Sequence, residues 1–255
     1  MTGERAQDRR VYEITGADRI HFLQGLVTND VSRLGEGIRY AALLSPQGKY
    51  LADFLLVGRG DAVLLDAQVG QAEALVRRLS MYRLRADVRI APSPLHVLRG
   101  LGAAPEGALA DPRDPRLGWR MYTAAEGGDP AIDWDAIRVE AVVPEAGIEL
   151  VPEESYILEA GFERLHGVDF HKGCYVGQEV TARMKHRTEL RKGLVRVRVA
   201  GGAAPGTEIT SGGKAAGRLF TRSGDRALAF LRFDRTAAMT AGDARVTLDD
   251  TADAE

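Results

Sequence analysis

HKGCYVGQE, residues 171–179, contains the only cysteine in a chain of 255 residues. A lone cysteine cannot close a disulfide within the chain. It is either a small apolar side chain that fills the interior, the commonest place for a free cysteine, or a thiol kept for its chemistry. The flanking residues and the rest of the chain bear on this choice.

Two glycines, a lysine and a predicted helix start surround Cys174. A helix that begins at Val176 or Gly177 places the thiol at a helix N-terminal end, where unpaired N–H groups and the helix dipole favour the thiolate. Lys172 adds a positive charge, and Gly173 and Gly177 allow close backbone approach or a positive φ. These features favour a reactive thiol, but residue chemistry alone leaves both interpretations open.

The segment that follows is strongly basic. Between residues 172 and 192, six lysines and arginines stand against two acids, a net charge of +4 in a chain whose net charge is −2. Such a run is usually a solvated helix face, but it also suits an anionic ligand such as a carboxylate tail, a phosphate or RNA. The cations are Lys172, Arg183, Lys185, Arg187, Arg191 and Lys192, and the acids are Glu179 and Glu189.

Composition restricts the class of protein. With 45% hydrophobic and 27% charged residues, the chain is typical of a globular protein, and its net charge excludes a general polyanion binder. A single cysteine excludes a disulfide scaffold and fits a reducing compartment. We find no secretory signal in MTGERAQDRR and no run of about 18 apolar residues that could span a membrane. These features predict a cytoplasmic protein without a membrane contact.

The first 187 residues mix strands and helices without regular alternation, which predicts an α+β domain with mainly antiparallel sheets. A hairpin is expected around Pro46-Gln47-Gly48, with residues 42–45 facing residues 50–56. Helices are expected after a cap at Thr15 or Asp18, within residues 71–88, and over PEESYILEAGFERL, residues 152–165, which has a proline and acids in its first turn. Further short strands are expected at residues 11–14, 62–66, 88–90 and 95–98.

The character of the chain changes near residue 188. GLVRVRV, residues 193–199, alternates strictly, and three more short strand patterns follow, separated by turn residues. This spacing predicts a small antiparallel barrel or sandwich. The domains are therefore predicted to span residues 1–187 and 188–255.

Common catalytic and metal-binding motifs are absent. The sequence has no G-x-S-x-G elbow, no P-loop and no H-E-x-x-H, and one cysteine among five histidines matches no standard zinc spacing. We therefore predict no metal ligands. Trp134, in the polar stretch AIDWDAIRVE, is typical of a core anchor, although an indole is also the natural stacking partner of a flat heteroaromatic ligand.

KGCYVGQE together with TARMKHR resembles the signature K-G-C-[FY]-x-G-Q-E of the YgfZ family, folate-binding proteins related to the aminomethyltransferase (T-protein) of the glycine cleavage system. The segments ITGADRIHFLQGLVTNDV, LLSPQGKYLADFLL and RVEAVVPEAG lie in the same order as comparable segments of that family. The resemblance covers most of residues 11–199. It implies an aminomethyltransferase-like fold of two interlocked α+β lobes around a central folate channel, followed by a C-terminal antiparallel β-barrel.

The resemblance also implies a set of site residues. Tetrahydrofolate or a derivative is expected in the central channel, with Trp134 against the pterin, because a tryptophan before the R-x-E segment contacts folate in the family. A second tryptophan that some members use falls at about Arg9 and is not matched. Cys174 is the expected reactive thiol and Asp53 the expected acid–base group. The remaining expected folate-binding residues are Lys172, Gly173, Tyr175, Gly177, Gln178, Glu179 and Arg183.

Three functional hypotheses follow from the resemblance and from the basic segment. The first is an accessory factor that assembles or maintains iron–sulfur enzymes, including those that modify tRNA, using Cys174. The second is a folate-dependent one-carbon transferase or demethylase acting on a small amine; it is weakened because Ala52 replaces one acid of the aspartate pair that the aminomethyltransferases carry. The third is a non-catalytic module that docks a protein or tRNA through residues 172–192. The sequence leaves open whether the chain is an enzyme.

Overall fold

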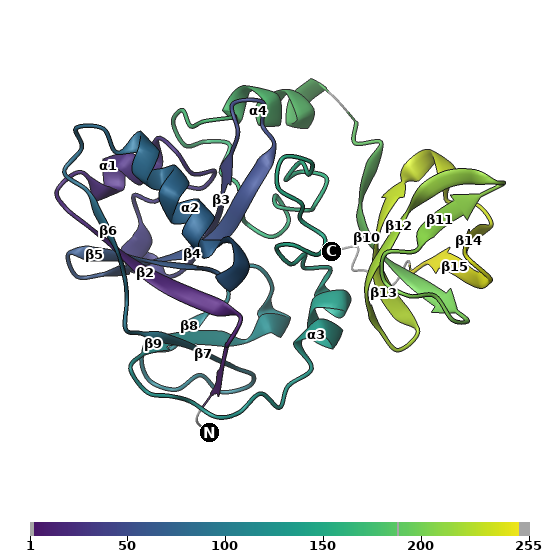
Figure 1. The fold of residues 1–255 in the computed structure, drawn as a ribbon, viewed down its shortest axis with the longest axis horizontal. Helices are drawn as coiled ribbons and strands as arrows, with labels where there is room; N and C mark the ends of the chain where they lie inside the picture. The colour runs from purple at the N-terminus through teal and green to yellow at the C-terminus, as the bar shows by residue number, and fades with distance from the viewer. Residues whose placement is uncertain (1–2, 188, 250–255) are drawn as a thin grey trace.

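A computed structural model describes residues 3–187 and 189–249 of the chain. Two sheets with their helices form one body, and a closed β-barrel stands beside it, with helix α3 on the side of the body that faces the barrel (Figure 1). No helix within these residues is long and apolar enough to cross a membrane.

A five-stranded antiparallel sheet, in the order β3-β4-β5-β2-β6, is the centre of the body. The predicted hairpin is confirmed, because Ala42 pairs with Asp53 and Leu44 with Tyr50. The predicted third strand pairs with the second, as expected at that distance in sequence. The strands are β2 (Arg9–Thr15), β3 (Arg39–Leu44), β4 (Tyr50–Arg59), β5 (Ala62–Gln68) and β6 (Arg89–Pro92).

Both faces of this sheet are buried, which explains why its strands read as nearly continuous apolar runs. Phe54 and Leu56 on β4 join one core cluster with helices α1 (Arg19–Gln24) and α2 (Val69–Tyr82). Leu55 and Val57 point to the opposite face, as the period of two requires, and join a second cluster with Phe162. The sheet therefore separates two cores.

The expected side-chain cap at the start of α1 is wrong. Asp18 holds the N-cap position, but its side chain makes no capping hydrogen bond. Its carboxylate instead accepts from the backbone N–H of Asp87, at 2.8 Å. A contact with the chain 69 residues away has replaced the local one.

A second antiparallel sheet, in the order β1-β7-β9-β8, was only partly visible in the sequence. Of its strands, only β7 matches a predicted one. The two shortest are two residues long each, too short for any alternation to show. The strands are β1 (Glu4–Arg5), β7 (His96–Gly100), β8 (Leu109–Ala110) and β9 (Trp119–Thr123), and the helix α3 (Trp134–Ala141) follows, with short 3₁₀ turns at Leu34–Glu36 and Pro115–Leu117.

The helix expected over residues 152–165 is wrong, since this segment consists of successive turns. Glu153 and Gly161 have φ of 65° and 81°, which an α-helix does not allow. The backbone exchanges hydrogen bonds with the start of β4, where Tyr50 N donates to Ser155 O and Glu153 N donates to Tyr50 O. Tertiary hydrogen bonds and the burial of Phe162 thus override a local helical preference.

The predicted C-terminal β-unit is a closed six-stranded barrel, in the order β10-β13-β12-β11-β14-β15. Its first strand begins at Lys192, and the helix α4 (Gln178–Arg187) precedes it. The second predicted domain begins at residue 188, and this residue lies outside the described residues. The strands are β10 (Lys192–Ala200), β11 (Glu208–Ser211), β12 (Lys214–Ser223), β13 (Arg226–Arg232), β14 (Met239–Ala241) and β15 (Ala244–Leu248), with a 3₁₀ turn at Phe233–Arg235.

Candidate functional site

Trp134 lines a cavity of about 540 Å³ between the two sheets and α3. Its wall combines one aromatic ring with side chains that can donate or accept hydrogen bonds and with charges of both signs. Such a mixture suits a flat polar ligand with an anionic tail. The lining side chains include Asp8, Gln68, Gln71, Arg99, Trp134, Asp135, Arg138 and Glu145.

The first turn of α3 fixes the indole. Asp133 caps the helix by accepting from Ala136 N at 2.9 Å, so Trp134 is the first helical residue. The indole N–H donates to Glu4, whose other oxygen accepts two backbone N–H groups of residues 131 and 132. Burial by itself raises the pKa of Glu4, but these donors hold it below its ordinary value. The Arg99 guanidinium lies 4.5 Å from the indole ring centroid.

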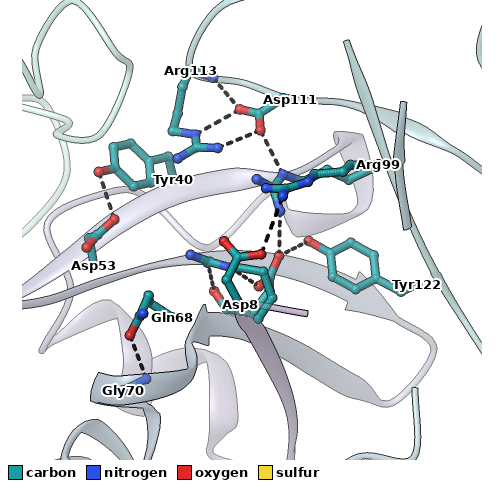
Figure 2. Close-up of polar contacts among 12 residues, drawn as sticks. Asp8, Tyr40, Asp53, Gln68, Gly70, Arg99, Asp111, Arg113 and Tyr122 are labelled. Atoms are coloured by element: carbon teal, nitrogen blue, oxygen red, sulfur yellow. Dashed lines mark hydrogen bonds and ion pairs between the residues drawn. The ribbon is translucent and has the colours of Figure 1, made fainter. Parts of the chain in front are cut away.

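A buried network of arginines and aspartates continues the wall inward (Figure 2). Asp66 is fully buried and pairs with Arg9 at 2.6 Å and with Arg120 at 3.2 Å. Arg120 also pairs with Asp111 at 2.7 Å, and Arg113 pairs with the same carboxylate at 2.8 Å. Burial opposes ionisation of the two aspartates, yet the arginines hold the pKa of both below the ordinary value. The network is therefore ionised and rigidly paired.

Glu145 is the carboxyl group of the cavity that lacks such pairing. It lines the cavity, and no hydrogen bond of its side chain is present among the described residues. Burial raises its pKa above the ordinary value, while Arg9 and Arg138 act in the opposite direction. Glu145 is thus an available acceptor for ligand N–H groups.

Asp53 lies apart from both the cavity and solvent. Only 4% of Asp53 is exposed, and its two oxygens accept from the hydroxyls of Tyr40, at 2.9 Å, and Tyr50, at 2.6 Å. It is not among the residues that line the cavity of Trp134. Burial raises the pKa of both tyrosines, and Asp53 raises it further, so their hydroxyls stay protonated as donors.

Cys174 is exposed and lies on a loop before α4, not inside the protein. The interior-filler interpretation is therefore wrong for this structure. The helix begins at Gln178, one or two residues later than predicted. Gly177 has φ of 86°, and a Cβ there would lie 2.7 Å from Ser45 O, so this glycine lets the loop pack on the β3–β4 turn.

The other motif residues have varied surroundings. Lys172 and Tyr175 are buried, whereas Gly173 and Cys174 are exposed. Burial lowers the pKa of Lys172 to about 8 and raises that of Tyr175 to about 12. Lys172, together with His171 and Tyr40, lines a second cavity of about 830 Å³. On α4, Gln178 is half-buried, while Glu179 and Arg183 are exposed.

The structure therefore separates the expected site residues into three places: the cavity of Trp134, the buried Asp53 and the segment around Cys174. Trp134 lines one cavity, and none of the seven expected motif residues near Cys174 lines it with Trp134. The basic run is also divided: Lys172 is buried, Lys185 pairs with Glu163, and Lys192 pairs with Glu159 at 3.4 Å. No group of three or more His, Cys, Asp or Glu side chains in residues 3–187 and 189–249 could hold a metal ion.

Sequence reasoning missed Arg99 and Glu145 in the wall of this cavity, and Arg113 and Arg120 in the network behind it. These residues come from segments far apart in the chain. One signal was present: Asp66 interrupts the apolar strand AVLLDAQ, and a charge inside a buried strand requires a partner. The identity of that partner depends on the tertiary structure.

Comparisons with known proteins identify the family. The chain is 33% identical over 277 residues to the human protein named iron–sulfur cluster assembly factor IBA57, mitochondrial, across 89% of this chain and 76% of that protein. The mouse protein of the same name is 32% identical over 276 residues, with the same coverage. Residues 191–253 match the family described as CAF17, C-terminal beta-barrel domain. This chain belongs to the IBA57/YgfZ family.

Membership in the IBA57/YgfZ family agrees with the resemblance found in the motif. The fold is also similar to the glycine cleavage system aminomethyltransferase T from Bartonella henselae, with a TM-score of 0.72 over 97% of this chain and 86% of that chain. At 13% identity this similarity shows the fold alone. The predicted α+β aminomethyltransferase-like fold with a C-terminal antiparallel barrel is confirmed.

Proposed function

We propose that this member of the IBA57/YgfZ family is a folate-binding accessory factor for iron–sulfur proteins, with Cys174 as a reactive or transiently ligating thiol. The observation that carries the proposal is the exposure of Cys174 on a loop outside the cavity of Trp134. A thiol in this position is accessible to a large partner while a small ligand occupies the cavity. The curated relatives carry the name of iron–sulfur cluster assembly factors.

The cavity residues fit tetrahydrofolate chemically. The indole of Trp134 offers a stacking surface, and Glu145 can accept from the amide and amino N–H groups of a pterin. Arg99 can pair with a carboxylate of the glutamate tail. Bound folate would supply a one-carbon carrier, and the chain's own residues would bind and orient it.

A fluorescence titration tests the folate part of the proposal. The chain has two tryptophans, and Trp119, 4% exposed, is the matched control because it does not line the cavity. Tetrahydrofolate should quench wild-type emission, and Trp134→Phe should weaken binding several-fold, because a phenyl ring has a smaller stacking face and lacks the N–H that donates to Glu4. Trp119→Phe should bind as the wild type does. Equal affinity in all three proteins would exclude Trp134 from the site.

A complementation assay tests the thiol. Cys174→Ala should bind tetrahydrofolate with unchanged affinity but fail to restore iron–sulfur enzyme activity in cells that lack the protein. Ser223→Ala, at the far end of β12, is the control substitution. Full rescue by Cys174→Ala would contradict a role for the thiol, whatever the folate result.

The geometry gives less support to one-carbon transfer. Both oxygens of Asp53 are occupied by tyrosine hydroxyls, and Ala52 fills the place of the second acid. Turnover of tetrahydrofolate with N-methyl donors, lost in Asp53→Asn, would restore this alternative.

The client proteins and the compartment remain predictions. Arg183 and Arg191 are exposed and could contact tRNA or an acidic partner. The cytoplasmic location expected from the sequence contrasts with the mitochondrial names of the eukaryotic relatives. Binding to tRNA should weaken as salt increases and should weaken further in Arg183→Gln.

A further inference from the structure

Cys174 lies in a two-residue exposed span between two buried side chains. Lys172 is 8% exposed and Tyr175 is 7% exposed, whereas Gly173 and Cys174 face solvent. A Cβ built on Gly173 would meet no atom within 4 Å. The span has little packing of its own, so its position depends on the residues at its two ends.

Lys172 secures the first end through its side chain. Its ammonium donates to Val27 O at 2.5 Å and to Asn29 O at 2.8 Å. Both acceptors are backbone atoms of the segment between α1 and β3. An ammonium has three donors, and two of them are used here by carbonyl groups of the protein.

These two bonds are the last in a series of hydrogen bonds that join residues 166–172 to residues 27–29. Thr28 Oγ1 donates to Gly167 O at 2.6 Å, and Asn29 Nδ2 donates to His166 O at 2.7 Å. Asp169 N donates to Thr28 O at 3.0 Å. Beyond Lys172 the series stops, and the exposed residues begin.

Tyr175 secures the second end. Its ring is buried in the core cluster that contains Phe162, and it lies 5.2 Å from the Lys172 ammonium. Two residues later, Gly177 packs on the β3–β4 turn. Because both ends are held, the backbone of residues 173 and 174 has few conformations available.

We propose that Lys172 is a positioning residue, whose bonds to Val27 and Asn29 hold the cysteine loop so that Cys174 stays exposed to a partner. This role differs from the folate-binding role that the resemblance implies for Lys172. It rests on the proposed function only in that Cys174 is the working thiol.

Hydrogen exchange and thiol alkylation test the proposal without any iron–sulfur client. Lys172→Met keeps the apolar stem and removes the donors; Lys214→Met, at an exposed lysine on β12, is the control. In Lys172→Met, amides of residues 167–176 should exchange about tenfold faster or more, as expected when hydrogen bonds worth about 1 kcal/mol each are lost. Iodoacetamide should alkylate Cys174 several times more slowly, because a released loop can cover the thiol. Lys214→Met should match the wild type.

Unchanged exchange or unchanged alkylation in Lys172→Met overturns the positioning role, whatever becomes of the client assay. If that variant does not fold, the wild-type protein gives the test. In ¹H–¹⁵N spectra of the lysine ammonium groups, the bonded Lys172 should give a slowly exchanging signal that Lys214 lacks, identified by its loss in Lys172→Arg. Absence of that signal would overturn the proposal.

Discussion

The cavity of Trp134 and the loop of Cys174 differ in how their polar groups are held. In the network behind the cavity wall, Asp66 and Asp111 are almost completely buried and are paired with three arginines. In the loop, Cys174 is exposed, and only the flanking Lys172 and Tyr175 reach the interior. One region is fixed from all sides, and the other is fixed at two points.

Under the proposed function, this difference would separate small-molecule recognition in the cavity from partner contact at the loop. Buried charges are costly unless they are paired, so the paired network behind the cavity must be coupled to the stability of the whole domain. An exposed two-residue span carries almost no such coupling. Substitutions in the buried network should therefore lower the unfolding free energy. Substitutions in the exposed span should leave the unfolding free energy nearly unchanged but reduce activity.

The largest effect is expected for Asp66→Ala. Removal of the carboxylate leaves Arg9 and Arg120 buried without this partner, so the unfolding free energy should fall by about 3–5 kcal/mol in urea denaturation. Asp234→Ala, at an exposed pair with Arg232, should leave it unchanged. Equal stability of the two variants would show that the buried network does not support the fold.

The next largest loss of unfolding free energy is expected when acid protonates the buried aspartates. The pKa values of Asp66 and Asp111 lie below their ordinary value of 3.8, so the unfolded chain takes up protons before the folded one. Their contribution to stability is present above pH 3.8 and is lost as the pH falls through the lowered values, by up to about 1.4 kcal/mol per pH unit for each group. Urea midpoints between pH 2 and 6 measure this loss, and Asp111→Asn should make the curve less steep. An unchanged slope in that variant would contradict the assignment.

A smaller effect is expected for Gln68→Ala. Gln68 lines the cavity, and its side chain caps α2 by accepting from Gly70 N at 2.6 Å. Loss of this cap should lower the unfolding free energy by about 1 kcal/mol, measured in urea. Gln24 lies outside the cavity, where its side chain bonds Asp30. Gln24→Ala should therefore leave tetrahydrofolate affinity unchanged, and it is the control for any effect of Gln68→Ala on binding.

The smallest effect on stability is expected for Cys174→Ser. Because the side chain is exposed and unpacked, the unfolding free energy should change by no more than about 0.5 kcal/mol. Restoration of iron–sulfur enzymes should nevertheless fail. A loss of stability comparable to that of Gln68→Ala would mean that the loop is coupled to the core after all.

Much of the fold was visible in the sequence because its signals are local. The β3–β4 hairpin follows from a Pro-Gln-Gly turn between apolar runs, and the barrel strands follow from alternation such as that of residues 193–199. Residues 152–165 show the opposite case. Their helical signals were real, but bonds to Tyr50 and burial of Phe162 stabilise a chain of turns more strongly.

The sequence by itself determined the family, the single thiol and the presence of Trp134 before an R-x-E segment, because these depend on residue type and order. Only the tertiary structure decided that Trp134 and Cys174 lie in different surroundings, that Asp53 is enclosed by two tyrosines, and that Lys172 points inward to backbone carbonyls. The physical reason is that burial and pairing of charges are set by segments distant in the chain. No spacing within HKGCYVGQE could reveal that its lysine and its cysteine face opposite ways.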